Sequence, residues 1–148
     1  MQREIKKYAH GLSSIYVHMS FKIKYCHKVF GNKEFREECQ TCFKKTAEEY
    51  NINVFSMGFD LNHAHMILDL GKYDEPYVRK LFKGRSGRFL LEKFPEIKNK
   101  YFYGSGLWGR QYYCYSIGSD MKMLQNYVAK QKFFLAMNNP YQKSLEAF

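Results

Sequence analysis

The 148-residue chain is poor in the features that mark several large classes of protein. It contains 3 prolines and 1 tryptophan, shows no internal repeat, and its longest stretch without Lys, Arg, Asp or Glu is the 14-residue segment Tyr8–Phe21. A segment of that length is too short to span a bilayer. Met1–Lys7 leads into no apolar run of the kind found in signal peptides. These absences argue against a membrane, secreted or repeat protein and predict one cytoplasmic domain.

Acidic side chains are scarce relative to basic ones, with 14 Asp and Glu against 24 Lys and Arg, which leaves a formal net charge of +10. A field of this sign attracts polyanions, so nucleic acid or an anionic membrane is the expected partner. Aromatic residues make up 18% of the chain, and their rings offer surfaces on which bases can stack. The composition therefore favours nucleic acid.

The four cysteines include a single Cys-x-x-Cys pair, Cys39 and Cys42, and no second pair that would complete a zinc site. Both fall on the apolar stripe of a predicted helix. We therefore interpret them as packed free thiols rather than as metal ligands or a redox pair.

Hydrophobic periodicity predicts an alternating order of strands and helices. Residues 15–25 alternate with period two, which indicates a strand with an apolar face and a polar, basic face carrying Tyr16, His18, Ser20, Lys22 and Lys24. The next predicted elements are a helix capped by Asn32 and ending at Tyr50, and a hairpin of strands Asn51–Phe59 and His63–Leu70. A second helix is predicted to open at Asp74 or Glu75; it can break near Gly84 or Gly87 and stops before Pro95. A loop Tyr101–Gly109, a strand Gln111–Ile117 and a helix over about 121–137 complete the order. This order, β-α-β-β-α-β plus one helix, predicts an α+β, ferredoxin-like antiparallel sheet with an appended C-terminal helix.

The clearest chemical signal is His63-Ala64-His65 on a predicted strand. Residues i and i+2 of a strand point to the same face, so the two imidazoles can share a divalent cation, although ordinary surface histidines meet this pattern more often. Tyr127 and Gln131 lie four residues apart on the last helix and hence on one of its faces. Tyr127 also fits the apolar stripe of that helix, so these residues alone leave its role open.

Basic residues that can bind phosphate gather on the first strand, on one helix and before the last strand. The helix segment suits phosphate contact but equally a solvated helix end. The arginine near the last strand is flanked by Trp and Tyr rings on which bases can stack. The candidate DNA-binding residues are Lys22, Lys24, Lys80, Lys83, Arg85, Arg88 and Arg110.

Several motifs occur in an order that resembles a known family. They are Lys24-Tyr25, His63-Ala64-His65, Leu81–Ser86, Leu107–Tyr113, Ser116–Gly118 and Tyr127–Gln131, and they extend over most of the chain, from about Ser14 to Gln131. In this order they resemble the single-tyrosine HUH transposases of IS200-like insertion sequences. The resemblance implies one transposase domain over 1–148, with a core of about 12–118 and a C-terminal helix of about 119–137 that carries the catalytic tyrosine.

The resemblance also implies a reaction. Tyr127 is expected to be the nucleophile, and His63, His65 and Gln131 are expected to bind Mg²⁺ or Mn²⁺. Attack on single-stranded DNA would leave a 5′-phosphotyrosine and a free 3′-hydroxyl. No nucleotide cofactor is expected, because one phosphodiester is exchanged for another.

The partners implied by the resemblance are single-stranded DNA with subterminal hairpins and a second copy of the chain. In such a homodimer the tyrosine helix can serve the partner's histidines, and the protein would be associated with the nucleoid when bound to DNA. Where the family often carries Asp before the first histidine, this chain has Asn62, with Asp60 two positions earlier. Both are candidates for contacting a histidine ring that binds metal.

Two other functions stay open. A ferredoxin-like sheet with exposed aromatic rings could bind single-stranded DNA or RNA by stacking, without catalysis. A domesticated relative of the transposases could act on repeated genomic hairpins. The ordered set of His63, His65, Tyr127 and Gln131 favours an enzyme, because binding alone does not need it.

Overall fold

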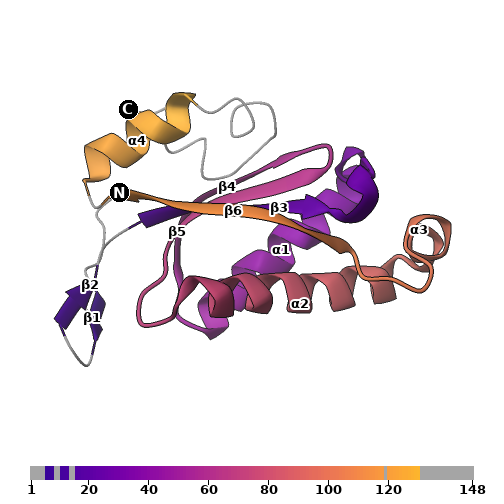
Figure 1. The fold of residues 1–148 in the computed structure, drawn as a ribbon, viewed down its shortest axis with the longest axis horizontal. Helices are drawn as coiled ribbons and strands as arrows, with labels where there is room; N and C mark the ends of the chain where they lie inside the picture. Colours follow the sequence, from indigo (N-terminus) through magenta and orange to yellow (C-terminus); the bar gives the residue numbers. More distant parts are fainter. Residues whose placement is uncertain (1–5, 9–10, 14–15, 119, 131–148) are drawn as a thin grey trace.

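A four-stranded antiparallel sheet forms the centre of the computed structural model, which describes residues 6–8, 11–13, 16–118 and 120–130. The strand order is β4-β5-β3-β6, so β3 and β5 lie inside the sheet and β4 and β6 at its edges (Figure 1). The strands are β3 (Tyr16–Ile23), β4 (Asn53–Asp60), β5 (His63–Asp69) and β6 (Trp108–Gly118). This order and the antiparallel pairing confirm the predicted α+β, ferredoxin-like sheet.

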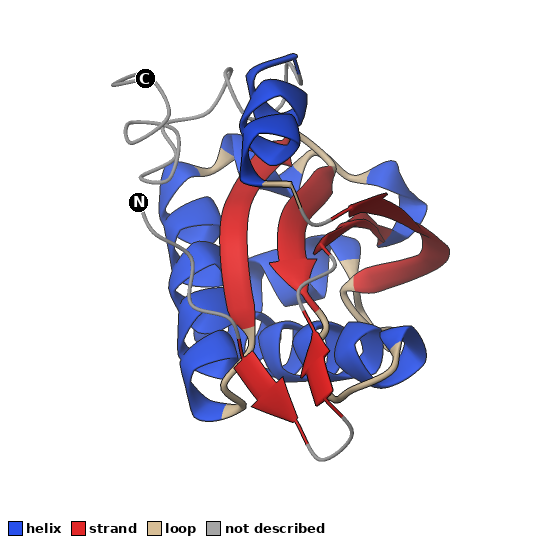
Figure 2. Ribbon diagram, turned by 90° about the vertical axis from the view of Figure 1, so that its left-hand side faces the viewer, coloured by secondary structure: helices blue, strands red, loops and turns tan. Residues whose placement is uncertain are grey.

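Two long helices, α1 (Lys33–Glu49) and α2 (Glu75–Lys93), cover one face of this sheet (Figures 1 and 2). Each begins at a side chain that accepts a hydrogen bond from an N–H of the first turn. Asn32 accepts from the Phe35 N–H at 3.1 Å, and Asp74 accepts from the Tyr77 N–H at 2.8 Å. Both predicted helix starts are confirmed.

The core between the sheet and these helices combines alternate strand residues with large aromatic rings. Ala64 and Met66 of β5 are fully buried in it, and Phe43 of α1 meets Phe82 of α2 edge to face, with ring centroids 5.6 Å apart. Because side chains alternate across a strand, the two histidines of β5 belong to the opposite face.

That opposite face is covered at one end by α4 (Met121–Lys130), as Figure 1 shows. Leu124 and Val128 of this helix are buried against Tyr16, Phe55 and Ile67 of the sheet. The helix is described as far as Lys130, so its predicted continuation to about residue 137 lies outside the described residues.

The polar face predicted for the first strand is consequently not a solvent-exposed surface along its whole length. His18 and Ser20 of β3 are only 0% and 2% exposed, while Lys22, farther along the strand, is partly exposed. Period two assigns these side chains correctly to one face. The alternating pattern cannot indicate that α4 and the tyrosine rings of β6 cover this face.

The α2 helix runs through Gly84 and Gly87 without the break that these glycines suggested. A Cβ on Gly87 would lie 3.5 Å from the Trp108 ring, so this glycine permits close packing of β6 on an intact helix. Pro95 ends α2 as predicted, but it also opens a further helix, α3 (Pro95–Tyr101), which the sequence did not predict. Proline is well suited to the first position of a helix.

Several boundaries also differ from expectation. β3 ends at Ile23 rather than at Tyr25, and β6 begins at Trp108 rather than at Gln111. The short elements that were not predicted are β1 (Lys6–Tyr8), β2 (Gly11–Ser13) and the 3-10 turns η1 (Lys24–Cys26) and η2 (Val29–Gly31). Within the described residues, no helix has the length and apolar character needed to cross a membrane.

Candidate active site

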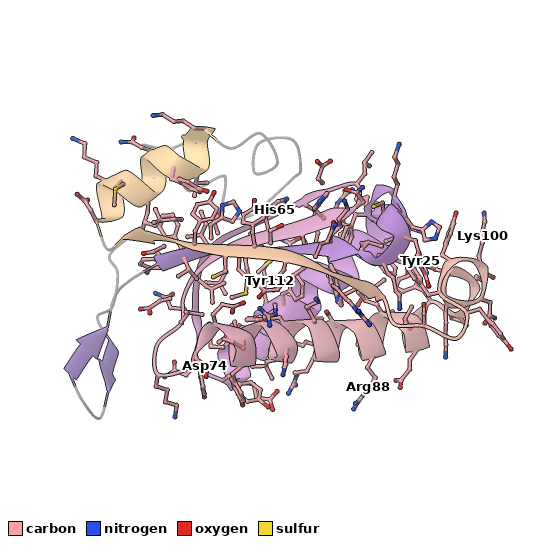
Figure 3. All side chains as sticks on the ribbon, in the orientation of Figure 1. Tyr25, His65, Asp74, Arg88, Lys100 and Tyr112 are labelled. Atoms are coloured by element: carbon pink, nitrogen blue, oxygen red, sulfur yellow. The ribbon has the colours of Figure 1, made fainter. Side chains whose placement is uncertain are left out.

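Two histidines of β5 lie side by side on the sheet face that α4 partly covers. The rings of His63 and His65 stack with centroids 5.7 Å apart and an interplanar angle of 23°. β5 pairs with β4 on one side and with β3 on the other, which fixes the backbone of both residues. The two imidazoles share a face as expected, and Figure 3 shows His65 on the side of the sheet that faces α4.

A third histidine, His18 of β3, lies next to this pair. The strand register places Ser20 opposite His65 and brings His18 Nε2 to 3.4 Å from His65 Nδ1. The sequence alone places His18 among the polar positions of the first strand and gives it no role in a site. Its position in the alternating pattern is a signal, but the pairing of β3 with β5 is needed to make it a neighbour of His65.

Tyr127 is held above His18 by α4. Its hydroxyl lies 2.5 Å from His18 Nδ1 and also contacts the hydroxyl of Tyr115. The burial of Leu124 and Val128 against the sheet directs this side of the helix toward the histidines. Tyr127 therefore reaches the histidine cluster within one chain. Gln131, expected on the same helix face, lies outside the described residues.

Two tyrosines of β6 flank the histidines from the edge of the sheet. The Tyr113 hydroxyl lies 3.4 Å from both His18 Nε2 and His65 Nδ1, and the Tyr115 hydroxyl lies 3.3 Å from His18 Nδ1. Their rings stack with centroids 5.5 Å apart, as alternate residues on one face of a strand can. Neither residue was predicted to belong to the site, although their i, i+2 spacing on a strand was a usable signal.

Burial controls the protonation of these groups. It lowers the pKa of His18 to about 4, and burial followed by the nearby His18 and His63 lowers the pKa of His65 to about 3. Burial and then the charge of Lys22 lower the pKa of His63. Burial, reinforced by the contact with Tyr115, raises the pKa of Tyr127 above its usual range. At neutral pH the imidazoles are therefore neutral, and the Tyr127 hydroxyl keeps its proton.

The stacked pair is compatible with a divalent cation, because neutral imidazole nitrogens are metal ligands and the two rings lie next to each other on one face. Across the part of the chain that the structure describes, no group of three His, Cys, Asp or Glu side chains is arranged to hold an ion. A cation at this pair would need further ligands, and water and phosphate oxygen atoms are ligands that Mg²⁺ accepts.

The two other candidate residues near the histidine pair lie at the β4–β5 turn. Asp60 is opposite His63 in the hairpin, and its charge opposes the lowering of the His63 pKa, while its carboxylate accepts the Leu61 N–H at 2.8 Å. The side chain of Asn62 donates to the Cys26 carbonyl at 3.5 Å. The Asp60 side chain thus bonds within the turn and acts on His63 through its charge, whereas the Asn62 side chain links the turn to η1.

Five of the seven predicted DNA-binding residues fall into two groups. Lys22, Lys24 and Arg110 line a cavity of about 450 Å³ at the end of β3 and the start of β6. Arg85 and Arg88 line a second cavity of about 470 Å³, between α1 and α2 on the helical side of the sheet.

The other two lysines of this set, both on α2, differ in their surroundings. Lys80 is exposed. Lys83 is half-buried, and its ammonium donates to the Gly109 carbonyl at 2.8 Å, so it ties the start of β6 to the helix. Cys39 is buried and Cys42 half-buried on α1, which agrees with their interpretation as packed free thiols.

We expect the metal-free protein to lose stability as the pH falls from 7 to 5. In the unfolded chain both His18 and His65 take up a proton near pH 6.5, whereas in the fold they do so only near pH 4 and 3. Their contribution is therefore fully present above about pH 6.5, and it decreases below that by about 1.4 kcal/mol per pH unit for each histidine. Urea unfolding at pH 7, 6 and 5 in excess chelator measures this slope. The His18→Gln variant should show a shallower slope, and an equal slope would contradict the assignment.

The fold and the site together define an α+β protein whose ferredoxin-like sheet carries a histidine–tyrosine cluster on one face. The family model described as "Transposase IS200 like" matches residues 11–131, and the chain belongs to this family of transposases. It is 27% identical over 127 residues to the transposase for insertion sequence element IS200 of Salmonella typhimurium, covering 85% of this chain and 82% of that protein, and the Salmonella typhi transposase matches to the same extent.

Two solved structures share the fold. A crystal structure from Deinococcus radiodurans R1, provisionally assigned as a transposase, superposes with a TM-score of 0.68 at 21% identity and covers 86% of this chain and 98% of its own. A REP-associated tyrosine transposase bound to a REP hairpin gives a TM-score of 0.55 at 12% identity and covers 85% of this chain and 68% of its own.

Proposed function

We propose that the chain is a metal-dependent transposase that cleaves and rejoins single-stranded DNA at insertion-sequence ends through a 5′-phosphotyrosine intermediate. The observation that carries this proposal is the line of groups on one sheet face. The Tyr127 hydroxyl contacts His18, and His18 contacts His65 beside His63. A module that only binds DNA needs rings and cations, but no tyrosine hydroxyl directed at buried, neutral histidines. Membership of the IS200-like family supports the transposition reaction.

In this proposal the Tyr127 oxygen attacks the scissile phosphorus. A tyrosine O–P bond forms and the P–O3′ bond breaks. The hydroxyl proton is lost to solvent and the freed 3′-oxygen takes one up from solvent, so the products are a 5′-phosphotyrosine and a 3′-hydroxyl. His18 Nδ1, 2.5 Å from the hydroxyl, accepts its hydrogen bond and orients it. Strand joining is the reverse attack by an incoming 3′-hydroxyl.

His63 and His65 would hold the divalent cation together with Gln131, and the Mg²⁺ or Mn²⁺ would neutralise the charge that develops on the phosphate oxygens. The His65 ring needs a fixed orientation for this task. Its Nδ1 lies 3.4 Å from the Tyr113 hydroxyl. An Nδ1–H that donates to this hydroxyl would orient the ring and leave the unprotonated Nε2 for the metal.

The proposed substrate is single-stranded DNA with subterminal hairpins, recognised by a homodimer. The net charge of +10 supports binding to DNA, and the REP hairpin in the solved relative supports a hairpin as the ligand by analogy. β6 pairs with β3 alone among the described strands, so its other edge is available to a second copy of the chain. In this structure α4 lies over the histidines of its own chain, so the homodimer is not needed to assemble Tyr127 with His18.

A labelled-strand cleavage assay tests the proposed function. Single-stranded DNA carrying the ends of the parent element is incubated with the protein and Mn²⁺ and run on a denaturing gel. We expect a 3′ label to migrate with the protein and a 5′ label to appear on a shorter free fragment, because the tyrosine retains the 5′ phosphate. A covalent adduct that retains the 5′ label would contradict the proposed polarity. A shift on native gels without any adduct would identify a binding module instead.

A further inference from the structure

A cavity of about 450 Å³ lies where β3 ends and β6 begins, at the end of the molecule away from α4. Figure 3 shows Tyr25, one of its lining residues, at that end. Its charged lining consists of Lys22, Lys24 and Arg110, and none of the described residues that line it carries a carboxylate. The volume is in the range of roughly 300–1,000 Å³ that small-molecule sites occupy. A hollow with this charge favours an anionic ligand.

The cavity adjoins the histidine pair. Lys22 is opposite His63 in the β3–β5 ladder, and residues directly opposite each other place their side chains on the same face of a sheet. A DNA strand with its scissile phosphate at the histidines would therefore continue into the cavity.

Tyr25 stands at the rim of the cavity in an unusual backbone conformation. Its φ of 60° and ψ of 16° are left-handed, and Cys26 follows with a φ of 56°. Such angles are uncommon for bulky residues and concentrate at functional sites. Here they hold a large ring 66% exposed, with the ammonium of Lys24 5.6 Å from its centroid. An exposed ring beside cations is the arrangement that binds single-stranded nucleic acid by stacking.

Contacts from neighbouring elements hold the walls of the cavity in place. The Lys24 N–H donates to the Leu107 carbonyl at 2.9 Å, and Lys83 Nζ donates to the Gly109 carbonyl at 2.8 Å. A Cβ on Gly109 would lie 3.3 Å from the Lys22 carbonyl, so a glycine is what allows this close approach of β6 to β3. A site that is already formed spends little free energy on ordering when it binds its ligand.

We propose that this cavity binds one nucleotide of the single strand that flanks the scissile phosphate, with its base stacked on Tyr25 and its phosphate held by Lys22, Lys24 and Arg110. This inference rests on the proposed function, because it extends the DNA path from the histidines. The three cations would hold the backbone of any sequence. The ring would add a contact that tolerates every base, since each base has a face on which to stack.

Equilibrium binding of a fluorescent 12-nucleotide oligodeoxythymidine in excess chelator tests this subsite separately from cleavage. We expect Tyr25→Leu to weaken binding at least about fivefold, the lower end of what stacking one base contributes, and Tyr25→Phe to retain it. The left-handed backbone at this position is about as unfavourable for leucine as for tyrosine, so this substitution removes the ring without changing the strain of the turn. Arg110→Gln should reduce the slope of log Kd against log salt by about 0.7, the amount for one phosphate contact with a single strand.

The matched controls are Tyr77→Leu and Lys72→Gln, which remove an exposed tyrosine and an exposed lysine near the start of α2. Neither should change Kd or the salt slope. Circular dichroism and thermal melting of every variant establish that it is folded.

The subsite would be overturned if Tyr25→Leu bound the oligonucleotide with wild-type affinity, or if Arg110→Gln kept the wild-type slope of log Kd against log salt. In either case a normal covalent adduct from the wild-type chain would leave the proposed function standing. If the wild-type chain does not bind the oligonucleotide at all, the subsite is also overturned, and the labelled-strand cleavage assay then decides on the proposed function separately.

Discussion

Replacing Tyr127 by phenylalanine is expected to lower the yield of the covalent protein–DNA adduct by more than about 10³-fold, as loss of a nucleophile does in other enzymes. The change removes only the hydroxyl that contacts His18 and Tyr115. In the wild-type structure the Tyr127 ring packs with the apolar residues of α4 and lies edge-on to the His18 ring, with centroids 5.4 Å apart. A phenylalanine ring can make the same contacts. Fold and DNA affinity should therefore be preserved.

The measurement is adduct formation on a denaturing gel, with binding of the same DNA recorded in parallel. Tyr115→Phe is the matched control, because its hydroxyl also contacts His18 and comes from the sheet rather than from α4. We expect Tyr115→Phe to retain the adduct. If Tyr127→Phe gave the normal yield while Tyr115→Phe gave none, the nucleophile would belong to β6.

The second large effect is expected from His63→Ala, which should reduce Mn²⁺-dependent cleavage by more than about 100-fold. Loss of a residue that merely supports a metal ligand costs about 10- to 100-fold in affinity or activity, and loss of a ligand should cost more. His63 is only partly buried, so its removal opens less of a cavity than removal of the buried His65 would. The variant is thus a test of chemistry more than of folding.

Calorimetric titration with Mn²⁺ should show weakened binding in His63→Ala, and cleavage assays should show the matching loss. His27→Ala provides a control, since His27 packs on Tyr101, with ring centroids 4.6 Å apart, and belongs to a different cluster. Full cleavage by the wild-type chain in excess chelator would argue against metal dependence, whatever the variants show.

Much of the fold follows from local patterns. Side chains alternate across strands, so the spacing of His63, Ala64 and His65 is enough to put both histidines on one face and Ala64 in the core. Helix starts are equally local, because Asn32 and Asp74 satisfy N–H groups only three residues away. Glycines and prolines were less informative. Gly87 lies within an unbroken helix because close packing against Trp108 outweighs its low helix preference. Pro95 begins a helix because proline suits the first helical position, a role that was not predicted from the sequence.

From the residues alone, members of the candidate site could be found only where they are close along the chain. The His63–His65 pair lies on one strand, and the family resemblance singled out Tyr127. His18 and Tyr113 come from two other strands and meet His65 through the order β5-β3-β6, which depends on sheet pairing between distant segments. No periodicity within a single segment contains that information.

The amino-acid order of each segment was sufficient to assign faces, caps and the sign of the charge, because those properties depend on neighbours within a turn or a strand. The protonation and orientation of the site depend instead on what packs above the sheet. Leu124 and Val128 place α4 over Tyr16 and Ile67, and this covers a face that the sequence pattern marks as polar. Burial beneath α4 and the tyrosines of β6 is what keeps His18 neutral and directs Tyr127 to it. Desolvation of His18 requires the sheet and the elements above it to be assembled, so the shift of its pKa cannot be predicted from the sequence of any one segment.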